Sequence, residues 1–375
     1  MFDQIIKDNR QWIEDTFARI DTKFQQVAVR SRDKLPYTSI DGVHDDYSTK
    51  DVAWWTNGFF GGMMWLLYER TKEQVYRDTA IKSESLLNGA FANVQELHHD
   101  VGFMWHILSG ANYRLTGDLS SRNTNLLVAN LLMARYNVEG DFIRCWNGPD
   151  TEGLTIIDCM MNIPLLYWAH RETGDHRYRD IAIRYADMAM RDHVRDDGSV
   201  NHIVVHDTHS VKVLGTMAGQ GYAIGSSWSR GVSWALYGFT LSYIHTGEER
   251  YLEVARRVAK HFIEETKSTD WLPRLDFRQP ATPLYYDSTA GAIASCGLIE
   301  LARISPNDAE YYLGSALSIL KAMGDKWCDY SIDTDSMLLM GSERYTRGIH
   351  MPIIYGDYYY VEAITKLLGS TFLPW

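Results

Sequence analysis

The sequence predicts an all-α protein whose helical hairpins close into a ring, an α/α toroid. Apolar residues recur at helical spacing along almost the whole chain, and the connections between these segments repeat one turn motif. Unusual polar and aromatic residues fall at the starts of alternate segments. In an open solenoid these starts would be spread along a surface, whereas in a closed ring they meet at one end. Their placement therefore favours the ring.

The periodicity predicts twelve helices, which pair into six hairpins. Their expected ranges are 4–24, 57–70, 73–91, 103–116, 119–136, 156–173, 176–193, 231–246, 249–266, 287–304, 308–327 and 356–369. No linker rich in proline, glycine or serine divides the 375 residues. We therefore expect residues 1–375 to form a single domain.

A recurring turn joins the helices, at 69–76, 171–178 and 245–251, with a partial copy at 115–118. A glycine ends one helix through a left-handed cap in most copies, and acidic residues open the next helix. A tyrosine follows in the three full copies, and we expect it to pack back across its own hairpin.

Every second helix begins at an unusual residue or motif. These are Trp55, His98-His99-Asp100, Asp158, the 228–234 segment, Tyr285-Tyr286-Asp287 and Gly356-Asp357-Tyr358. If the even-numbered helices form the inner wall, these starts meet at one end of the barrel. A pocket there would be surrounded by helix N-termini, which favour an anion.

Asp158 is the strongest candidate for a chemical role. It is expected in the first turn of an apolar helix, between Ile157 and Cys159. Because apolar surroundings disfavour a charged carboxylate, we expect Asp158 to retain a proton readily and to act as a general acid. The alternative is a helix cap, but Thr155 is available for that task.

Composition narrows the class of ligand. The chain has 12 Trp, 23 Tyr and 12 Phe, enough for a large core and for rings that line a sugar-binding cavity. A formal charge of −11 argues against nucleic acids and anionic membranes as partners. The amino terminus lacks the pattern of a signal peptide, and no run of about 18 apolar residues predicts a membrane span. We therefore expect a cytoplasmic protein.

The 196–227 segment differs from the helical remainder. Residues 200–206 alternate like a short strand, and 215–225 contains several glycines around Gln220. We interpret the segment as a long loop or hairpin folded over the mouth of the pocket. His202, His206 and His209 could be metal ligands, but ordinary strand and loop histidines explain them better. The four scattered cysteines, with no CxxC pair, predict buried free thiols.

Six motifs occur in order along nearly the whole chain. They are 55–65 (Trp-Thr-Asn-Gly onward), 99–103 (His-Asp-Val-Gly-Phe), 156–166 with Asp158 and Asn162, 228–231 (Trp-Ser-Arg-Gly), 286–298 (Tyr-Asp-Ser onward) and 356–363 (Gly-Asp-Tyr onward). With these motifs the chain resembles the unsaturated glucuronyl hydrolases of glycoside hydrolase family 88.

The resemblance implies an (α/α)6 barrel that needs neither metal nor cofactor. Its expected substrates are oligosaccharides left by polysaccharide lyases, which carry a 4,5-unsaturated uronate at the non-reducing end. Members of the family hydrate the C4=C5 enol ether: an acid protonates C4, water adds at C5, and the resulting hemiketal opens. Because the glycosidic carbon is not attacked directly, the distance between the two carboxylates does not distinguish a retaining from an inverting mechanism, as it does in most glycosidases.

The resemblance also assigns roles. Asp158 matches the general acid and base, and Asp100 matches a second carboxylate that orients the sugar and favours a protonated Asp158 by like-charge repulsion. Further positions match the sugar pocket: the aromatic residues Trp55, Trp146 and Trp234, and the polar residues His99, His202, Gln220 and Arg230. Among these, Arg230 is the expected partner of the uronate carboxylate.

Two departures affect the expected substrate preference. Relatives often have Thr-His-Gln-Gly where this chain has Ala218-Gly219-Gln220-Gly221, so one imidazole near the pocket is missing. The loop between Trp146 and Asp158 is short, and the 344–356 stretch lacks part of a segment that contacts the leaving sugar in some relatives. The identity and sulfation of the leaving sugar stay open, as does the choice between a monomer and a homodimer.

Three alternative functions are considered. The first is an unsaturated rhamnogalacturonyl hydrolase of family 105, which shares the barrel and the chemistry. The second is a sugar epimerase on the same toroid, which exchanges protons through histidines. The third is a noncatalytic helical-repeat protein that binds a saccharide or peptide in its acidic, aromatic concavity.

Overall fold

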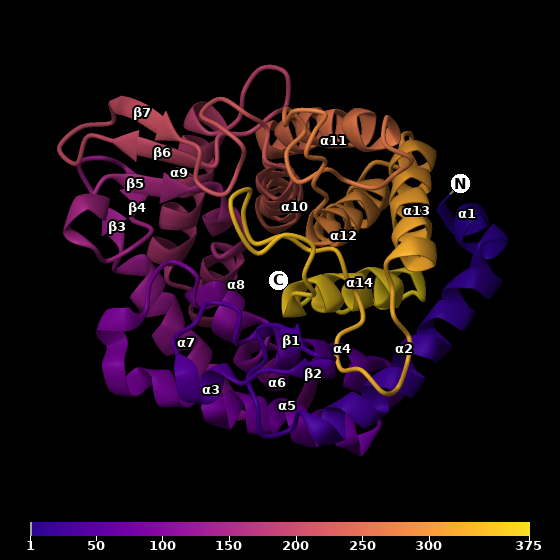
Figure 1. Cartoon of the computed structure of the whole chain (residues 1–375). Helices are drawn as coiled ribbons and strands as arrows, with labels where there is room; N and C mark the ends of the chain where they lie inside the picture. The colour runs from indigo at the N-terminus through magenta and orange to yellow at the C-terminus, as the bar shows by residue number, and fades with distance from the viewer. Residues whose placement is uncertain (1) are drawn as a thin grey trace.

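The computed structural model describes residues 2–375 and forms an (α/α)6 barrel, as predicted (Figure 1). Within these residues six inner helices alternate with six outer ones. The inner helices are α4 (Phe59–Thr71), α6 (Ser109–Thr116), α8 (Pro164–Thr173), α10 (Ser229–Thr246), α12 (Ser288–Ile304) and α14 (Ile354–Leu367). The outer helices are α5 (Gln74–Leu87), α7 (Leu119–Met133), α9 (His176–Asp192), α11 (Glu249–Lys267), α13 (Ala309–Lys326) and α2 (Arg10–Arg30). Two short helices, α1 (Phe2–Asp8) and α3 (Tyr47–Lys50), complete the α-helices of residues 2–375, and the 3-10 helices η1 (Asn88–Glu96) and η3 (Pro149–Thr151) lie in the connections.

The inner and outer helices differ in how much of their surface is apolar and buried. The inner helices α12 and α14 are buried along nearly their whole length, as expected for helices that are apolar all round. The outer helix α11 buries one face, with Val254, Val258 and Phe262, and presents charged residues on the other. The ring closes where α14 packs against α4. Buried apolar side chains from Ile13 to Trp375 form one connected core.

The recurring turn has the predicted left-handed cap. Gly117, Gly174 and Gly247 have φ angles of 80°, 74° and 73° at the ends of α6, α8 and α10. Lys72 takes the same conformation, with a φ of 62°, at the end of α4. The threonine before each cap accepts a hydrogen bond from the N–H two residues further on, as Thr173 does at 3.2 Å. This bond fixes the direction in which the outer helix leaves.

The tyrosine of the turn contacts more than one hairpin. The ring of Tyr251 packs across its own hairpin, as predicted, with its centroid 6.2 Å from that of Phe239 in α10. Each hydroxyl donates to the preceding outer helix, because a buried phenol needs an acceptor and that helix provides one. The pairs are Tyr76 with Asp21 at 2.6 Å, Tyr178 with Asn130 at 2.8 Å, and Tyr251 with Asp187 at 2.9 Å. The hydroxyls thus also join each hairpin to its neighbour, a contact that the sequence did not predict.

Two inner helices begin later than predicted. The 156–173 segment divides into the 3-10 helix η4 (Ile157–Met161) and α8, which starts at Pro164. A proline has no N–H and is preorganised for the first helical turn, so it marks a new start. The 103–116 segment divides into a π-helical turn, η2 (Gly102–His106), and α6. Both divisions lie at the end of the barrel where the predicted site residues gather.

The strand predicted at 200–206 is confirmed as β6 (Ile203–His206). It is the middle strand of an antiparallel sheet with β5 (Leu154–Ile156) and β7 (Val213–Met217). Strand β5 was not predicted, because the three residues Leu154, Thr155 and Ile156 directly before a helix are indistinguishable from its first turn. Two small hairpins, β1–β2 (Ser39–Ile40 and Val43–His44) and β3–β4 (Tyr136–Asn137 and Phe142–Ile143), complete the strands in residues 2–375.

None of the helices described here combines the length and the apolar character that crossing a bilayer requires.

Candidate active site

The predicted site residues gather at the N-terminal end of the inner helices. Asp100 lies two residues before η2, Asp158 lies in η4, and Trp55 precedes α4. Loops between the helices bring in the remaining residues, including Gln220 after β7. The closed ring thus places residues more than a hundred positions apart at one mouth.

Asp158 has no structural hydrogen bond. Its side chain caps no helix, and its Oδ2 atom is buried without a hydrogen-bond partner. Nε2 of His202 lies 3.5 Å from this atom. Thr155 does not provide a cap either, because it lies in β5 and its hydroxyl is within 2.9 Å of the His193 ring. Asp158 is therefore free for chemistry.

Asp100 is held as a charged carboxylate. Burial raises the pKa of this carboxyl, but the charge and hydrogen bond of His99 and the charge of His98 bring it below its ordinary value. The Oδ1 atom lies 3.1 Å from Nε2 of His99, and Oδ2 lies 3.5 Å from Nδ1 of His98. Asp100 thus places a negative charge at the same mouth of the barrel as Asp158.

Asn162 connects the two carboxylate segments. Its Nδ2 donates to Oδ1 of Asp100 at 3.2 Å and to the main-chain carbonyl of Asp158 at 3.3 Å. Its Oδ1 accepts from the N–H of Phe103 at 2.8 Å. The sequence motif contains Asn162, but sequence reasoning gave it no role. Its position directly after η4, four residues after Asp158, is the signal that could have suggested one.

Two of the three predicted aromatic residues retain exposed ring surface. Trp55 is partly buried and lies 5.1 Å from the ring of Tyr355. Trp146 is also partly buried and meets the ring of His99 edge-on at 6.1 Å. His99 is itself fixed, because its Nδ1 donates to the carbonyl of Cys145 at 2.9 Å. Trp55 and Trp146 can therefore offer faces to a sugar.

Trp234 differs from expectation. Its side chain is 0% exposed and lies against Phe103 and Tyr359, with ring centroids 5.1 and 5.5 Å away. A ring without accessible surface has no face left for a sugar. Trp234 supports Phe103, which in turn packs against Trp55 at 5.5 Å.

Arg230 also differs from expectation. The guanidinium is buried and forms an ion pair with Asp287. Its Nη1 also donates to the Ser342 carbonyl, and its Nη2 donates to Gln220 Oε1 and to the Glu343 carbonyl at 2.8 and 2.7 Å. Burial alone would lower its pKa, but the charge of Asp287 raises it. Arg230 therefore positions Gln220 and the 342–343 loop, and it does not face an open pocket.

The histidine candidates for metal binding do not converge. His206 bonds to Thr155, and His209 is exposed beside Glu139. A different group comes closer: donor atoms of His98, His99 and Asp100 lie within 4.8 Å of one another, close enough to share a metal ion. Here the Asp100 carboxylate lies between the two imidazoles, with a nitrogen of each ring within 3.5 Å of one of its oxygens.

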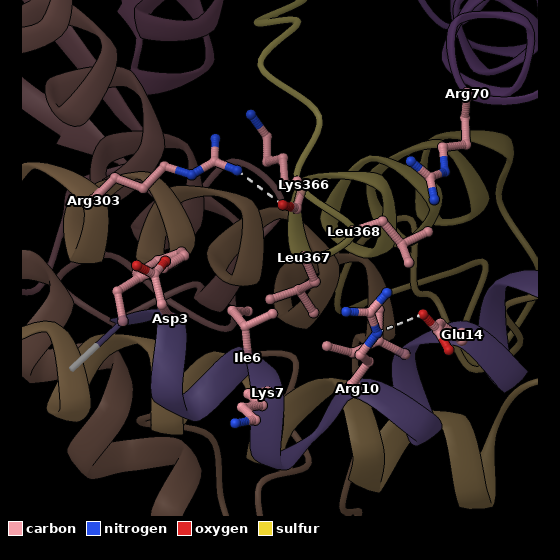
Figure 2. Close-up of a pocket in the computed structure, with 13 residues that line it drawn as sticks. Asp3, Ile6, Lys7, Arg10, Glu14, Arg70, Arg303, Lys366, Leu367 and Leu368 are labelled. Carbon is pink, nitrogen blue, oxygen red and sulfur yellow. Dashed lines mark hydrogen bonds and ion pairs between the residues drawn. The ribbon is translucent and has the colours of Figure 1, made fainter.

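A cavity of about 400 Å³ lies away from these residues, at the other end of the barrel (Figure 2). It lies between α1 and the C-terminal ends of the inner helices, beside Arg70, Arg303 and Lys366. Lys366 is committed to the buried Glu300 at 2.5 Å. Neither Asp100 nor Asp158 lines this cavity. We therefore place the candidate active site at the opposite mouth.

An (α/α)6 barrel with a buried carboxylate, a partly buried one and partly exposed tryptophans at one mouth defines a carbohydrate-active enzyme. Residues 27–242 match the model of Glycosyl Hydrolase Family 88. The chain belongs to this family and is a glycoside hydrolase.

The chain is similar to other members of the family over most of its length and of theirs. A protein named unsaturated glucuronyl hydrolase from Bacillus sp. strain GL1 is 34% identical over 346 residues, which cover 89% of this chain and 91% of the relative. An unsaturated chondroitin disaccharide hydrolase from Streptococcus pneumoniae is 32% identical, over 88% of this chain and 85% of the relative. The crystal structure of an unsaturated glucuronyl hydrolase from Streptococcus agalactiae has a TM-score of 0.88, with 27% identity and 97% and 93% of the two chains covered.

Proposed function

We propose that this enzyme releases 4,5-unsaturated glucuronic acid from the non-reducing end of unsaturated oligosaccharides. The observation that carries the proposal is the free carboxyl of Asp158, buried at Oδ2 and bound to no other group, at the mouth of a family 88 barrel. A carboxyl without a structural partner is available to give and take a proton.

In the proposed reaction Asp158 gives its proton to C4 of the unsaturated sugar. Water adds at C5 and loses a proton to the Asp158 carboxylate, which restores the acid. The product is a hemiketal at C5, which opens to a ketone by breaking the C5–O5 bond. This leaves a hemiacetal at C1, and its collapse to an aldehyde releases the leaving sugar as an alcohol. Asp100 keeps its negative charge and orients the ring hydroxyls, while Trp55 and Trp146 offer apolar faces.

The polar residues take more specific roles in this proposal. His99, His202 and Gln220 face the unsaturated sugar, and Arg230 acts on it through Gln220 because its own donors are bonded to protein. Trp234 acts through Phe103 in the same indirect way. The active enzyme is a single catalytic domain that works without metal or cofactor. A cytoplasmic location and a monomer or homodimer remain predictions from the sequence.

Relatives favour glycosaminoglycan-type substrates. The names of the compared proteins include unsaturated chondroitin disaccharide hydrolase, and one solved structure, 29% identical with a TM-score of 0.84, is described as specific for heparin. Because these relatives differ in their named substrates, we propose a hexosamine as the leaving sugar and do not assign its sulfation.

The test is a panel of lyase-generated unsaturated disaccharides from chondroitin, hyaluronan, heparin and pectin. Hydration removes the conjugated double bond, so turnover appears as a loss of ultraviolet absorbance. We expect turnover of at least one glycosaminoglycan disaccharide. Turnover of the pectin disaccharide alone would select the rhamnogalacturonyl reaction, an isomerised product without cleavage would indicate an epimerase, and binding without turnover would indicate a noncatalytic protein.

A further inference from the structure

The loop residue Gly219 lies against the partner of the catalytic carboxyl. It has a φ of +60°, and a Cβ added there would lie 2.0 Å from Nδ1 of His202. No side chain fits in that space. The main chain can therefore approach the imidazole only because residue 219 is a glycine.

This close approach produces one hydrogen bond. The backbone N–H of Gln220 donates to Nδ1 of His202 at 2.9 Å. Because a backbone N–H is always a donor, Nδ1 must be the unprotonated nitrogen of the ring. The proton of a neutral His202 then resides on Nε2, the atom 3.5 Å from Oδ2 of Asp158.

Both partners of this bond are held rigidly. Gln220 is fixed by Arg230, which donates to its Oε1 at 2.8 Å, and by the N–H of Tyr345, which donates to its carbonyl at 3.0 Å. The His202 carbonyl accepts from the N–H of Ile157, the residue before Asp158, at 3.1 Å. The loop, the histidine and the catalytic segment thus form one connected unit.

The tautomer has a consequence for Asp158. Its Oδ2 is buried and faces the Nε2–H group, and neither atom has another hydrogen-bond partner. A proton on Oδ2 would meet that N–H head-on. The acidic proton is therefore favoured on Oδ1, which is the oxygen left free for the substrate.

We propose that Gly219 is a positioning residue for the catalytic proton: it lets the Gln220 N–H hold His202 as the Nε2–H tautomer, which directs the proton of Asp158 to Oδ1. The inference rests on the proposed role of Asp158. It also assigns a purpose to the position where relatives often have histidine, because in this chain His202 fills the space that a side chain at 219 would need.

Nitrogen-15 NMR of the free enzyme tests the tautomer without any substrate. We expect His202, assigned by its absence in His202→Gln, to show a protonated Nε2 and an unprotonated Nδ1. The opposite tautomer, or a doubly protonated ring at neutral pH, would overturn the proposal. Because this measurement needs no turnover, its failure is distinguishable from failure of the proposed function.

Gly219→Ala tests the consequence for turnover. We expect kcat to fall by roughly 10- to 100-fold, the usual effect of misplacing one catalytic group, with a smaller change in KM. Gly225→Ala is the matched control, since Gly225 lies in the same loop with a φ of +75° and has nothing within 4 Å of an added Cβ. It shares the backbone strain but not the contact with His202. An equal loss of kcat in the two variants would reject the role of Gly219.

A double-mutant cycle separates action through His202 from a general effect on the loop. In a His202→Leu background, Gly219→Ala should lower kcat by less than twofold further, because its target is already gone. Full additivity of the two losses would contradict the proposal. His202→Gln, which retains an N–H donor near Asp158, should recover part of the activity that His202→Leu loses.

Discussion

Arg230 and Asp287 form an ion pair at 2.5 Å in which the two side chains are 1% and 0% exposed. Asp287 also caps α12 by accepting from the N–H of Thr289 at 3.1 Å. The pair therefore joins the starts of two inner helices, α10 and α12. Through its other donors Arg230 also fixes Gln220, so helix packing and the pocket share one residue.

Arg230→Met should destabilise the fold because it leaves the Asp287 carboxylate buried without its partner. Breaking a buried pair in this way costs about 3–5 kcal/mol. Urea denaturation would measure the free energy of unfolding. Arg10→Met is a suitable control, since Arg10 pairs with Glu14 at 72% side-chain exposure and such pairs contribute less than about 1 kcal/mol. Similar losses in both variants would show that burial of the pair does not matter.

Arg230 also shows the limit of inference from the sequence. Its motif identified the residue, but the acceptors of its guanidinium come from around residues 220, 287 and 342, which only the closed fold brings together. The helices and the glycine caps could be predicted because they depend on neighbours in sequence. The burial of Trp234 could not be, because its covering rings lie in η2 and α14. For the same reason the hydrogen bonds of the turn tyrosines to the preceding outer helix were not predicted.

Asp158→Asn should leave a folded protein with no measurable hydration of the double bond. An amide has nearly the same size but no acidic proton for C4, and general acid catalysis contributes roughly 100- to 10,000-fold. Ultraviolet absorbance would measure turnover, and circular dichroism would confirm folding. Asp150→Asn, at an exposed residue of the loop before β5, is the matched control and should retain full activity. Retained turnover in Asp158→Asn would remove it from the mechanism.

Asn162→Ala should reduce both stability and kcat. It leaves the N–H of Phe103 unsatisfied, which costs about 1–3 kcal/mol, and it releases Asp100 from the Asp158 segment. Asn125→Ala provides the comparison, because Asn125 is also 0% exposed but bonds to His106, away from both carboxylates. We expect similar losses of stability in the two variants and a loss of kcat only in Asn162→Ala. An equal loss of kcat in Asn125→Ala would show that Asn162 contributes to packing alone.

Asp357, at the start of α14, makes the stability of the fold depend on pH. Burial raises the pKa of this carboxyl to about 7, although two backbone N–H groups and the charge of Lys23 act in the opposite direction. The N–H of Leu338 donates to its Oδ1 at 2.6 Å, and the N–H of Met337 donates to Oδ2 at 3.0 Å. The folded state therefore binds this proton more tightly than the unfolded chain, whose aspartate has a pKa of about 3.9.

The sign of the effect follows from this difference. Protonated Asp357 contributes its full stabilisation of the fold below about pH 4. This contribution is lost as the pH rises through about 7, and the total loss in the free energy of unfolding is about 4 kcal/mol. Asp357→Asn cannot titrate, so the unfolding free energy of the native enzyme minus that of the variant should decrease between about pH 4 and about pH 8. Urea denaturation across this range measures the difference, and Asp333→Asn, an exposed neighbour, should show a flat one. A difference that rises with pH for Asp357→Asn would mean that the buried carboxyl is held as a carboxylate.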